Sequence, residues 1–304
     1  MRYIVTGAAG FIGSHLAEAL VAAGHEVVGI DSFTDYYDPA LKEDNAAGLD
    51  VRTVDLARDD LDFLGCDGVF HLAGQPGVRS FGHVFPLYLE RNVLASQRVF
   101  EAAARDHVRV VFASSSSIYG DAERYPTPEE TEPAPISPYG ITKLACEHLL
   151  RAYTRSVELD AVTLRYFTVY GPRQRPDMAF TRVLLAAAEG ASFELYGDGT
   201  QSRGFTFVAD AVEATVVAMT APAGAVYNVG GGSEATMLDA IALAERISGS
   251  SLDVRFLPTA AGDARRTSAD TSRIRDELGW RPHVSLEDGL RAQWQWASSR
   301  VGAR

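Results

Sequence analysis

Residues 2–13 read Arg2-Tyr3-Ile4-Val5-Thr6-Gly7-Ala8-Ala9-Gly10-Phe11-Ile12-Gly13, an apolar strand followed by a turn with three spaced glycines. A helical pattern then runs through Ala23, and a second apolar strand over residues 26–30 ends at Asp31. Strand, glycine turn, helix, strand and acid thus follow one another within about 30 residues, as a dinucleotide-binding βαβ unit requires. A glycine spacing alone also fits an ordinary tight turn, but the flanking strands and Asp31 favour a cofactor site.

Each part of this unit has a physical role toward a dinucleotide. Gly7 permits the tight turn, Gly10 lets backbone approach a pyrophosphate, and Gly13 lets the helix pack closely on the strand. The amino end of the helix then faces the phosphate charge. Asp31 would accept hydrogen bonds from the adenosine ribose and repel a 2′-phosphate, which predicts NAD rather than NADP. The predicted cofactor residues of this unit are Gly7, Gly10, Phe11, Ile12, Gly13, Asp31 and Ser32.

Strands and helices continue to alternate beyond this unit. Further strands are expected at residues 51–54, 68–72, 109–113 and 161–165, with helices at 86–105 and 138–156. This alternation predicts an α/β fold with a doubly wound parallel (Rossmann) sheet and helices on both faces. Ligands bind such sheets at the carboxyl ends of the strands.

The character of the chain changes near Pro172, where helices become shorter, connections longer, and arginines stand at predicted turns. We interpret residues 1–171 as an NAD-binding domain and residues 172–304 as a smaller, mostly C-terminal α/β lobe for the substrate. Helices are expected at 208–219 and 237–248. A strand near 225–230 is expected to return to the main sheet.

A second informative stretch is Ser137-Pro138-Tyr139-Gly140-Ile141-Thr142-Lys143. Ser137 suits a helix N-cap and Pro138 the first helical position, so a helix is expected to begin here. Tyr139 and Lys143 then lie one turn apart on one face. A free phenol has a pKa of ~10, but a nearby cation, the positive end of a helix and hydrogen bonds all favour the phenolate. The pair is a candidate general base with its supporting cation, although a surface Tyr beside a solvated Lys has the same spacing.

The composition argues against several classes of function. A net charge of −12 disfavours a nucleic-acid partner, because phosphate backbones require a basic surface. No apolar run approaches the ~20 residues of a membrane span, and the early first strand leaves no room for a signal peptide. Cys66 and Cys146 lack metal-ligand spacing and His71 has no partner ligands, so no metal site is predicted. A cytoplasmic location is the simplest expectation.

Together these motifs resemble the extended short-chain dehydrogenase/reductase superfamily, in its NAD-dependent sugar epimerase/dehydratase branch. The resemblance extends from Thr6 to the Leu278-Gly279-Trp280-Arg281-Pro282 segment. In that family the Ser or Thr four residues before a Tyr-Gly pair joins the Tyr and Lys as a catalytic triad. Here Tyr119-Gly120 makes that residue Ser115, beside Tyr139 and Lys143.

The resemblance also implies cofactor contacts and an assembly. Asp55 would contact the adenine, Asn92 would support the cofactor site, and Lys143 would hold the nicotinamide ribose. A homodimer would form through the helices at 86–105 and 138–156. The further residues that the resemblance places at NAD are Leu56, Leu72, Ala73 and Tyr166.

Within the branch, three segments resemble the UDP-glucuronate 4-epimerases. They are Asp31-Ser32-Phe33-Thr34-Asp35-Tyr36-Tyr37-Asp38-Pro39, Gln75-Pro76-Gly77-Val78-Arg79, and Phe167-Thr168-Val169-Tyr170-Gly171-Pro172-Arg173-Gln174-Arg175-Pro176-Asp177-Met178-Ala179. Those enzymes usually carry Asn where Ser32 stands, a change expected to weaken the ribose contact slightly. The His71-Leu72-Ala73-Gly74 segment also departs, since a second Ala is more usual there.

The residues after Ser115 favour an epimerase over a dehydratase. Dehydratases of the branch carry Asp-Glu there and nucleotide-sugar decarboxylases keep a Glu, whereas this chain has Ser116 and Ser117, which are neither strong acids nor strong bases. Their hydroxyls can donate to a carboxylate, and Thr168 adds a third donor where glucose-type 4-epimerases usually have Asn. A serine-rich strand end that only keeps a loop soluble is the alternative interpretation.

The remaining substrate contacts are mostly arginines. Arg175 is a candidate counter-charge for a carboxylate, although a solvated loop arginine fits equally well. Arg203 and one of the pair Arg265/Arg266 are expected at the diphosphate, since guanidinium forks suit phosphate oxygens. Asp263 resembles the family's contact to the nucleotide ribose. The predicted substrate residues are Arg79, Ser116, Ser117, Thr168, Arg175, Arg203, Asp263 and Arg266.

The resemblance therefore implies an NAD-dependent isomerase that interconverts UDP-glucuronate and UDP-galacturonate through a 4-keto intermediate. Two alternatives stay open within the branch: a 4-epimerase for neutral UDP-hexoses and a UDP-glucuronate decarboxylase. A catalytically silent NAD-binding sensor on the same fold is a third, but such proteins typically lose the Tyr or Lys that is intact here.

Overall fold

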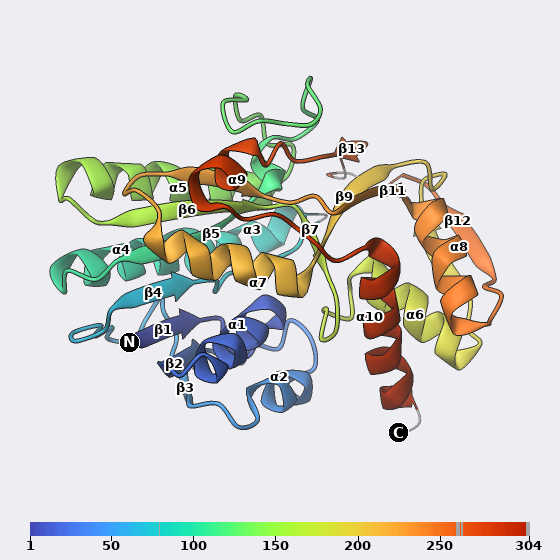
Figure 1. Ribbon diagram of the computed structural model, residues 1–304, viewed down its shortest axis with the longest axis horizontal. Coiled ribbons are helices and arrows are strands. Elements are labelled where there is room, and N and C mark those ends of the chain that lie inside the picture. The colour runs from blue at the N-terminus through green and yellow to red at the C-terminus, as the bar shows by residue number, and fades with distance from the viewer. Residues whose placement is uncertain (79, 260–261, 263, 302–304) are drawn as a thin grey trace.

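The computed structural model describes residues 1–78, 80–259, 262 and 264–301. The predicted substrate residues Arg79 and Asp263 lie outside the described residues. The chain forms a larger lobe around one long sheet and a smaller lobe beside it, which contains the C-terminal helix (Figure 1).

The larger lobe is built on a seven-stranded sheet in the order β10-β6-β5-β4-β1-β2-β3, and every pairing in it is parallel. Its strands are β1 (Arg2–Thr6), β2 (Glu26–Asp31), β3 (Val51–Thr53), β4 (Gly68–His71), β5 (Val110–Ser115), β6 (Ala161–Tyr166) and β10 (Val226–Val229). The predicted α/β, doubly wound fold is confirmed. In such a sheet the carboxyl ends of β1, β2 and β5 lie at one edge, where a ligand is expected.

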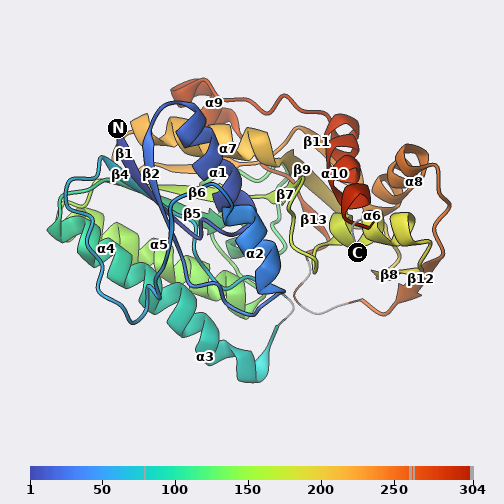
Figure 2. The same ribbon diagram turned by 90° about the horizontal axis from the view of Figure 1, so that it is seen from below.

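Helices cover both faces of this sheet (Figures 1 and 2). On one face lie α1 (Phe11–Ala22), α7 (Val208–Val217) and α9 (Ser272–Leu278), and on the other α4 (Ala95–Arg105) and α5 (Pro138–Ser156). Side chains of a strand alternate between the faces. In β1, Tyr3 and Val5 accordingly pack with α1 and α7, while Ile4 packs with α4 and α5.

Most predicted element boundaries are close to the observed ones, with three differences. The helix expected over 86–105 is divided into α3 (Phe85–Tyr88), a π-helical segment (Leu89–Leu94) and α4. The helix expected over 208–219 ends at Val217 and continues as a 3₁₀ turn, Ala218–Thr220. The strand expected at 109–113 extends to Ser115, because its pairing with β6 continues as far as Tyr166.

The smaller lobe has its own sheets and core. In its main sheet β9 (Ser202–Phe207) pairs with β7 (Thr168–Tyr170), β11 (Ser233–Thr236) and β13 (Arg266–Thr267), while β8 (Phe193–Tyr196) pairs with β12 (Val254–Leu257). Helices α6 (Ala179–Glu189), α8 (Met237–Ser248) and α10 (Leu286–Val301) pack on these strands. The chain crosses between the lobes more than once, since α7, β10 and α9 return to the larger lobe.

The remaining helical elements are α2 (Pro39–Ala46), between β2 and β3, and 3₁₀ turns at Gly82–Val84 and Ser116–Ile118. None of the helices that the structure describes is long and apolar enough to cross a membrane.

Candidate active site

A cavity of about 840 Å³ opens at the carboxyl ends of the parallel strands and is lined by residues of both lobes. That volume is in the range of small-molecule and cofactor sites. Most predicted site residues line it: Gly7, Gly10, Phe11, Ile12, Gly13, Asp31, Ser32, Asp55, Leu56, Leu72, Ala73, Ser115, Ser116, Ser117, Tyr139, Lys143, Tyr166, Thr168, Arg175 and Arg203.

The cofactor end of the cavity is shaped for close approach of backbone. A Cβ on Gly13 would stand 2.1 Å from the Gly7 carbonyl oxygen, so only glycine lets α1 begin this close to the turn. Gly10 is the N-cap of α1 and provides no side-chain cap. The amides of the first turn, which have no intrahelical partner, therefore form an anion site suited to a pyrophosphate.

Asp31 stands at the end of β2 with its carboxylate held in place. Its Oδ2 accepts a hydrogen bond from the Ala9 amide (3.2 Å), and its Oδ1 accepts one from the Phe33 amide (2.9 Å). The carboxylate lines the cavity beside the glycine turn, where it can accept hydrogen bonds from ribose hydroxyls. Turn, helix end and carboxylate fit a bound dinucleotide.

The three catalytic candidates reach the cavity from two adjoining elements. Ser115 is the last residue of β5, and its hydroxyl donates to Ser117 Oγ (3.0 Å). Ser137 caps α5 by accepting from the Gly140 amide (3.1 Å), as predicted. Tyr139 thus lies in the first turn of α5, and Lys143, one turn later, is buried.

Two close contacts dock α5 on the strand that carries Ser115. The Lys143 ammonium donates to the Ala113 carbonyl (2.8 Å) in β5. A Cβ on Gly140 would stand 2.4 Å from the Ser117 carbonyl oxygen, so glycine is required for α5 to begin against the Ser116–Ile118 turn. The helix that carries the base candidate is thereby held beside the hydroxyls of β5.

The substrate end of the cavity combines hydroxyls with paired arginines. Thr168 is the first residue of β7 and lines the same cavity as Ser116 and Ser117. The Arg175 guanidinium donates to both carboxylate oxygens of Asp177 (3.0 and 3.1 Å). Arg203 lines the cavity, and its guanidinium donates to main-chain carbonyls in its own lobe. Neutral donors and arginines suit an anionic ligand.

Comparison with known proteins identifies the family. A family model described as "NAD dependent epimerase/dehydratase family" matches residues 3–230. The chain belongs to the NAD-dependent epimerase/dehydratase family. The predicted family and NAD as its cofactor are thus confirmed, and the chain is an NAD-dependent enzyme of this family.

Several relatives in this family match the chain over nearly its whole length. The UDP-glucuronic acid 4-epimerase from Bacillus cereus, solved in complex with UDP-glucuronic acid and NAD, is 40% identical; the match covers 99% of this chain and 100% of that one, with a TM-score of 0.95. The uncharacterized UDP-glucose epimerase YtcB of Bacillus subtilis is 40% identical over 98% of both chains. The UDP-glucuronate 4-epimerase of Thermodesulfobacterium geofontis is 32% identical over 98% of this chain and 97% of its own.

Two predicted residues of this epimerase/dehydratase chain do not line the cavity. Asn92 is buried, with Oδ1 accepting from the Gln75 amide (2.6 Å) and Nδ2 donating to Thr142 Oγ1 (3.1 Å). It therefore ties the cavity-lining loop at Gln75 to α5. Arg266 instead pairs with Glu234 (2.7 and 3.0 Å) and lies over the Tyr125 ring. Arg266 is therefore not among the residues that line the cavity, and its expected diphosphate contact stays a prediction.

Lys42 is a cavity residue that the sequence did not reveal. It is buried in α2, 4.0 Å from Asp31 Oδ1, and donates to Thr34 Oγ1 (3.0 Å). Burial lowers the pKa of its ammonium group, which the Asp31 charge partly opposes. The α2 sequence is mostly polar and gives no sign of a buried cation. The only indication in the sequence that Lys42 lies near the cofactor site is its position three residues after the Asp31–Pro39 segment.

One further aromatic residue of the family resemblance, Tyr36, gains a role in the structure. Tyr36 and Tyr37 line the cavity, and the Tyr36 hydroxyl donates to Asp177 (3.2 Å). Burial, together with the Asp177 charge, raises the pKa of Tyr36 to about 12. Tyr36 therefore stays a neutral donor and helps to position the carboxylate that holds Arg175.

His71 is buried beneath the site rather than exposed in it. Its Nδ1 lies 2.7 Å from Thr6 Oγ1 and its Nε2 lies 3.0 Å from Ser96 Oγ. Burial, aided by the Lys143 charge, lowers the pKa of His71 to about 3. A neutral ring with both nitrogens in hydrogen bonds makes His71 a packing residue beneath the site rather than an acid or base within it.

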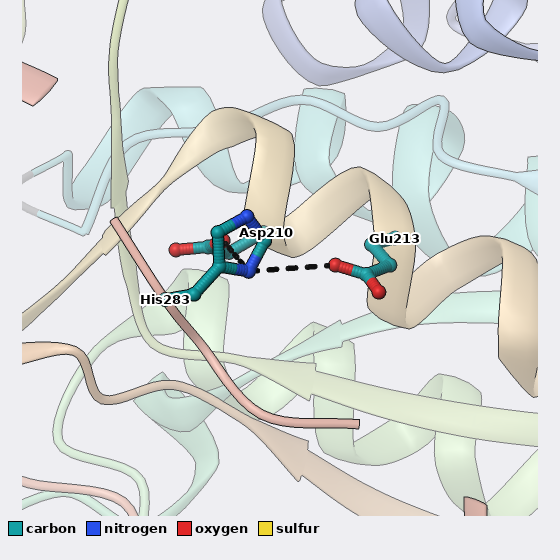
Figure 3. A group of neighbouring side chains, drawn as sticks. All are labelled: Asp210, Glu213 and His283. Atoms are coloured by element: carbon teal, nitrogen blue, oxygen red, sulfur yellow. Dashed lines mark ion pairs between the residues drawn. The ribbon is translucent and has the colours of Figure 1, made fainter. Parts of the chain in front are cut away.

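Within the described part of the chain, one His and carboxylate cluster has the proximity of metal ligands: Asp210, Glu213 and His283 (Figure 3). His283 Nδ1 lies 3.0 Å from Asp210 Oδ1 and 3.7 Å from Glu213 Oε2. Asp210 also accepts from the Val284 amide (3.1 Å). None of the three lines the cavity, and their contacts anchor the segment before α10 to α7.

Proposed function

We propose that the protein is a nucleotide-sugar 4-epimerase, an isomerase, whose substrate is UDP-glucuronate. The observation that carries the choice of sugar is the set of hydroxyls after Ser115. Ser116, Ser117 and Thr168 offer donors, and no carboxylate stands where a dehydratase or decarboxylase carries one. A sugar carboxylate would be bound there without charge repulsion.

The chain's own residues supply the proton chemistry of this proposal. Tyr139, as phenolate, accepts the proton of the sugar 4-hydroxyl, and Lys143 one helical turn away supplies the balancing positive charge. Ser115 donates to the reacting oxygen and stabilises charge as it develops. NAD, when bound, accepts the hydride from C4 and returns it to the other face, so it does not enter the net equation.

A uronate imposes a further demand on the site. The 4-keto intermediate of a uronic acid is a β-keto acid, which loses CO₂ readily when its carboxylate stands perpendicular to the carbonyl. An epimerase must therefore hold the carboxylate in another orientation while the ring turns. Ser116, Ser117 and Thr168 would provide that grip, with Arg175 nearby as a counter-charge once its pairing with Asp177 loosens.

A neutral UDP-hexose 4-epimerase is the second candidate, and the name of the B. subtilis relative favours it. The solved B. cereus relative favours a uronate instead. The two candidates differ in a measurable ratio: kcat/KM for UDP-glucuronate over that for UDP-glucose. We expect a ratio of about a hundred or more, because two charge-assisted hydrogen bonds contribute roughly 1.5–3 kcal/mol each. Equal use of both sugars would contradict the uronate assignment.

We further propose that the enzyme is a homodimer. Three large apolar side chains are half exposed on adjoining helical elements: Leu89 (45%) and Leu94 (45%) on the π-helical segment and Ile141 (50%) on α5. Burying the exposed half of each in an interface would contribute about half of the ~1.5–3 kcal/mol that full burial of an exposed side chain provides. Light scattering should give twice the monomer mass for the wild type, and Leu94→Glu should shift it toward the monomer. A wild type that is monomeric at micromolar concentration would exclude this assembly.

A further inference from the structure

A buried ion pair joins the helix that carries Tyr139 and Lys143 to the strand next to β5. Glu147, on α5, and Arg165, on β6, are each only 7% exposed. The Arg165 guanidinium donates to Glu147 Oε2 through its terminal nitrogen (2.8 Å) and to Oε1 through Nε (3.1 Å). Burial by itself would lower the pKa of Arg165, but its bonds to Glu147 outweigh this and the pKa is raised.

The Glu147 carboxylate has a third partner, and that partner adjoins the active site. The Ser114 hydroxyl donates to Glu147 Oε1 (2.5 Å). Ser114 immediately precedes Ser115 in β5, and Glu147 follows Lys143 by one turn of α5. A single carboxylate thus touches the strand that carries one catalytic candidate and belongs to the helix that carries the other two.

Other contacts fix the Arg165 side of this pair. Its second terminal nitrogen donates to the Tyr119 hydroxyl (2.7 Å) and to the Glu129 carbonyl (2.9 Å), and the Tyr119 hydroxyl donates to Asn228 Oδ1 (2.8 Å). Arg165 is therefore immobilised by strand β10 and the 129 loop as well as by α5. The next residue of β6, Tyr166, lines the cavity.

The stability of the fold alone does not explain why an ion pair is buried here. Well-packed apolar residues often stabilise a fold as much as a buried ion pair, because desolvating two charges is expensive. What an apolar pair could not do is accept the Ser114 hydrogen bond and set the rotation of α5 against β5. The Lys143–Ala113 contact fixes the helix at one turn, and the Glu147–Ser114 contact fixes it at the next.

We propose that Glu147, clamped by Arg165, is a positioning residue that sets Tyr139 and Lys143 in register with Ser115 through its hydrogen bond from Ser114. The inference rests on the proposed function, since it takes those three residues as the catalytic group. Proton transfer tolerates little misplacement: an error of ~1 Å can cost about a hundredfold in rate. The carboxylate therefore acts on kcat rather than on binding.

The test is a double-mutant cycle with Ser114→Ala, Glu147→Gln and the two combined. Glu147→Gln keeps the side-chain volume but loses the charge that Arg165 grips. We expect kcat to fall about 10- to 100-fold in Glu147→Gln and about fivefold or more in Ser114→Ala, with Kd for NAD and for UDP changed by less than about threefold. Because both substitutions act through the same contact, kcat of the double variant should equal that of Glu147→Gln. The two losses should not multiply.

Asp160→Asn is the matched control. Both Asp160 carboxylate oxygens accept hydrogen bonds from one Arg109 nitrogen, Nη1 (2.9 and 2.8 Å), and this second ion pair stands at the opposite, amino ends of β5 and β6. Asp160→Asn should leave kcat within about twofold, because this pair lies at the other end of the strands and does not contact the catalytic candidates. Arg165→Lys, which keeps the cation but not the fork, should recover part of the activity that Arg165→Met loses.

Several outcomes would overturn the proposal. They are an unchanged kcat in Glu147→Gln, losses that multiply in the double variant, or a parallel loss of NAD and UDP binding that marks general unfolding. If Glu147→Gln does not fold, Ser114→Ala alone decides between a lowered and an unchanged kcat. A wild type active only on UDP-glucose would contradict the proposed substrate instead, and the same variants would then be compared on that sugar.

Discussion

Thr168→Val is the most informative single change at the sugar end of the cavity. Valine keeps the shape and β-branching of threonine at the start of β7 and removes only the hydroxyl. Within the described residues, the Thr168 hydroxyl makes no hydrogen bond to protein, so its loss should disturb no internal contact. Ser117 is less suitable, because its Oγ accepts a hydrogen bond from the catalytic candidate Ser115.

The expected magnitude follows from the charge of the substrate. If Thr168 donates to the sugar carboxylate, losing that bond costs roughly 1.5–3 kcal/mol, which is about 10- to 150-fold in kcat/KM for UDP-glucuronate. UDP-glucose has a hydroxymethyl group in place of the carboxylate, so its kcat/KM should change by less than about threefold. Thr168→Ser, which keeps a hydroxyl, is the matched control and should stay close to wild type.

Both sugars are assayed side by side for the three proteins, and products are identified by mass. A looser grip should also let part of the 4-keto intermediate lose CO₂, which would release a UDP-4-keto-pentose and leave reduced cofactor on the enzyme. Equal losses for both sugars would refute a carboxylate contact at Thr168. A Thr168→Ser variant as poor as Thr168→Val would refute the role of the hydroxyl.

Three further changes test other parts of the site. Tyr139→Phe should abolish turnover while leaving Kd for UDP within a few fold, since only the proton acceptor is lost; substantial residual turnover would remove Tyr139 from the base role. Asp31→Ala should weaken NAD binding and admit NADP, because Lys42 then faces the 2′-phosphate without its carboxylate neighbour; adding Lys42→Ala should reverse the gain in a cofactor titration, and unchanged affinities would refute both roles. Burial lowers the pKa of His71 to about 3. The unfolded chain therefore binds more protons than the folded one between that value and ~6.5, so stability is complete above this window and falls by up to ~1.4 kcal/mol per pH unit as the pH drops through it. His71→Asn should flatten that slope in denaturant unfolding at pH 7, 6 and 5, and an unchanged slope would show that His71 does not titrate on unfolding.

The parts of the site that could be predicted from sequence depend on local geometry. The glycine turn places the start of α1 and Asp31 through a few adjoining residues, and Ser137 caps α5 through a contact three residues away. The Tyr119-Gly120 pair located Ser115 through the family resemblance. Such relations survive in the folded chain because chain connectivity enforces them.

The parts that could not be predicted depend on partners distant in sequence. Arg266 has the charge expected of a phosphate contact, but β11 and β13 flank β9 and bring Glu234 beside it. Glu147 and Arg165 look like ordinary helix and strand residues until the pairing of β5 with β6 places Ser114 beside Arg165, both in hydrogen bonds with Glu147. Only the assembled sheet shows which charges are already matched and which face the cavity.

The most direct measurement is an NMR spectrum of UDP-glucuronate incubated with the purified enzyme. The proposed function predicts a new anomeric signal of galacto configuration that grows to a constant ratio with the starting sugar, with the carboxylate retained and no net formation of NADH. A spectrum that stays unchanged while UDP-glucose is converted, or one dominated by a pentose that has lost CO₂, would contradict it.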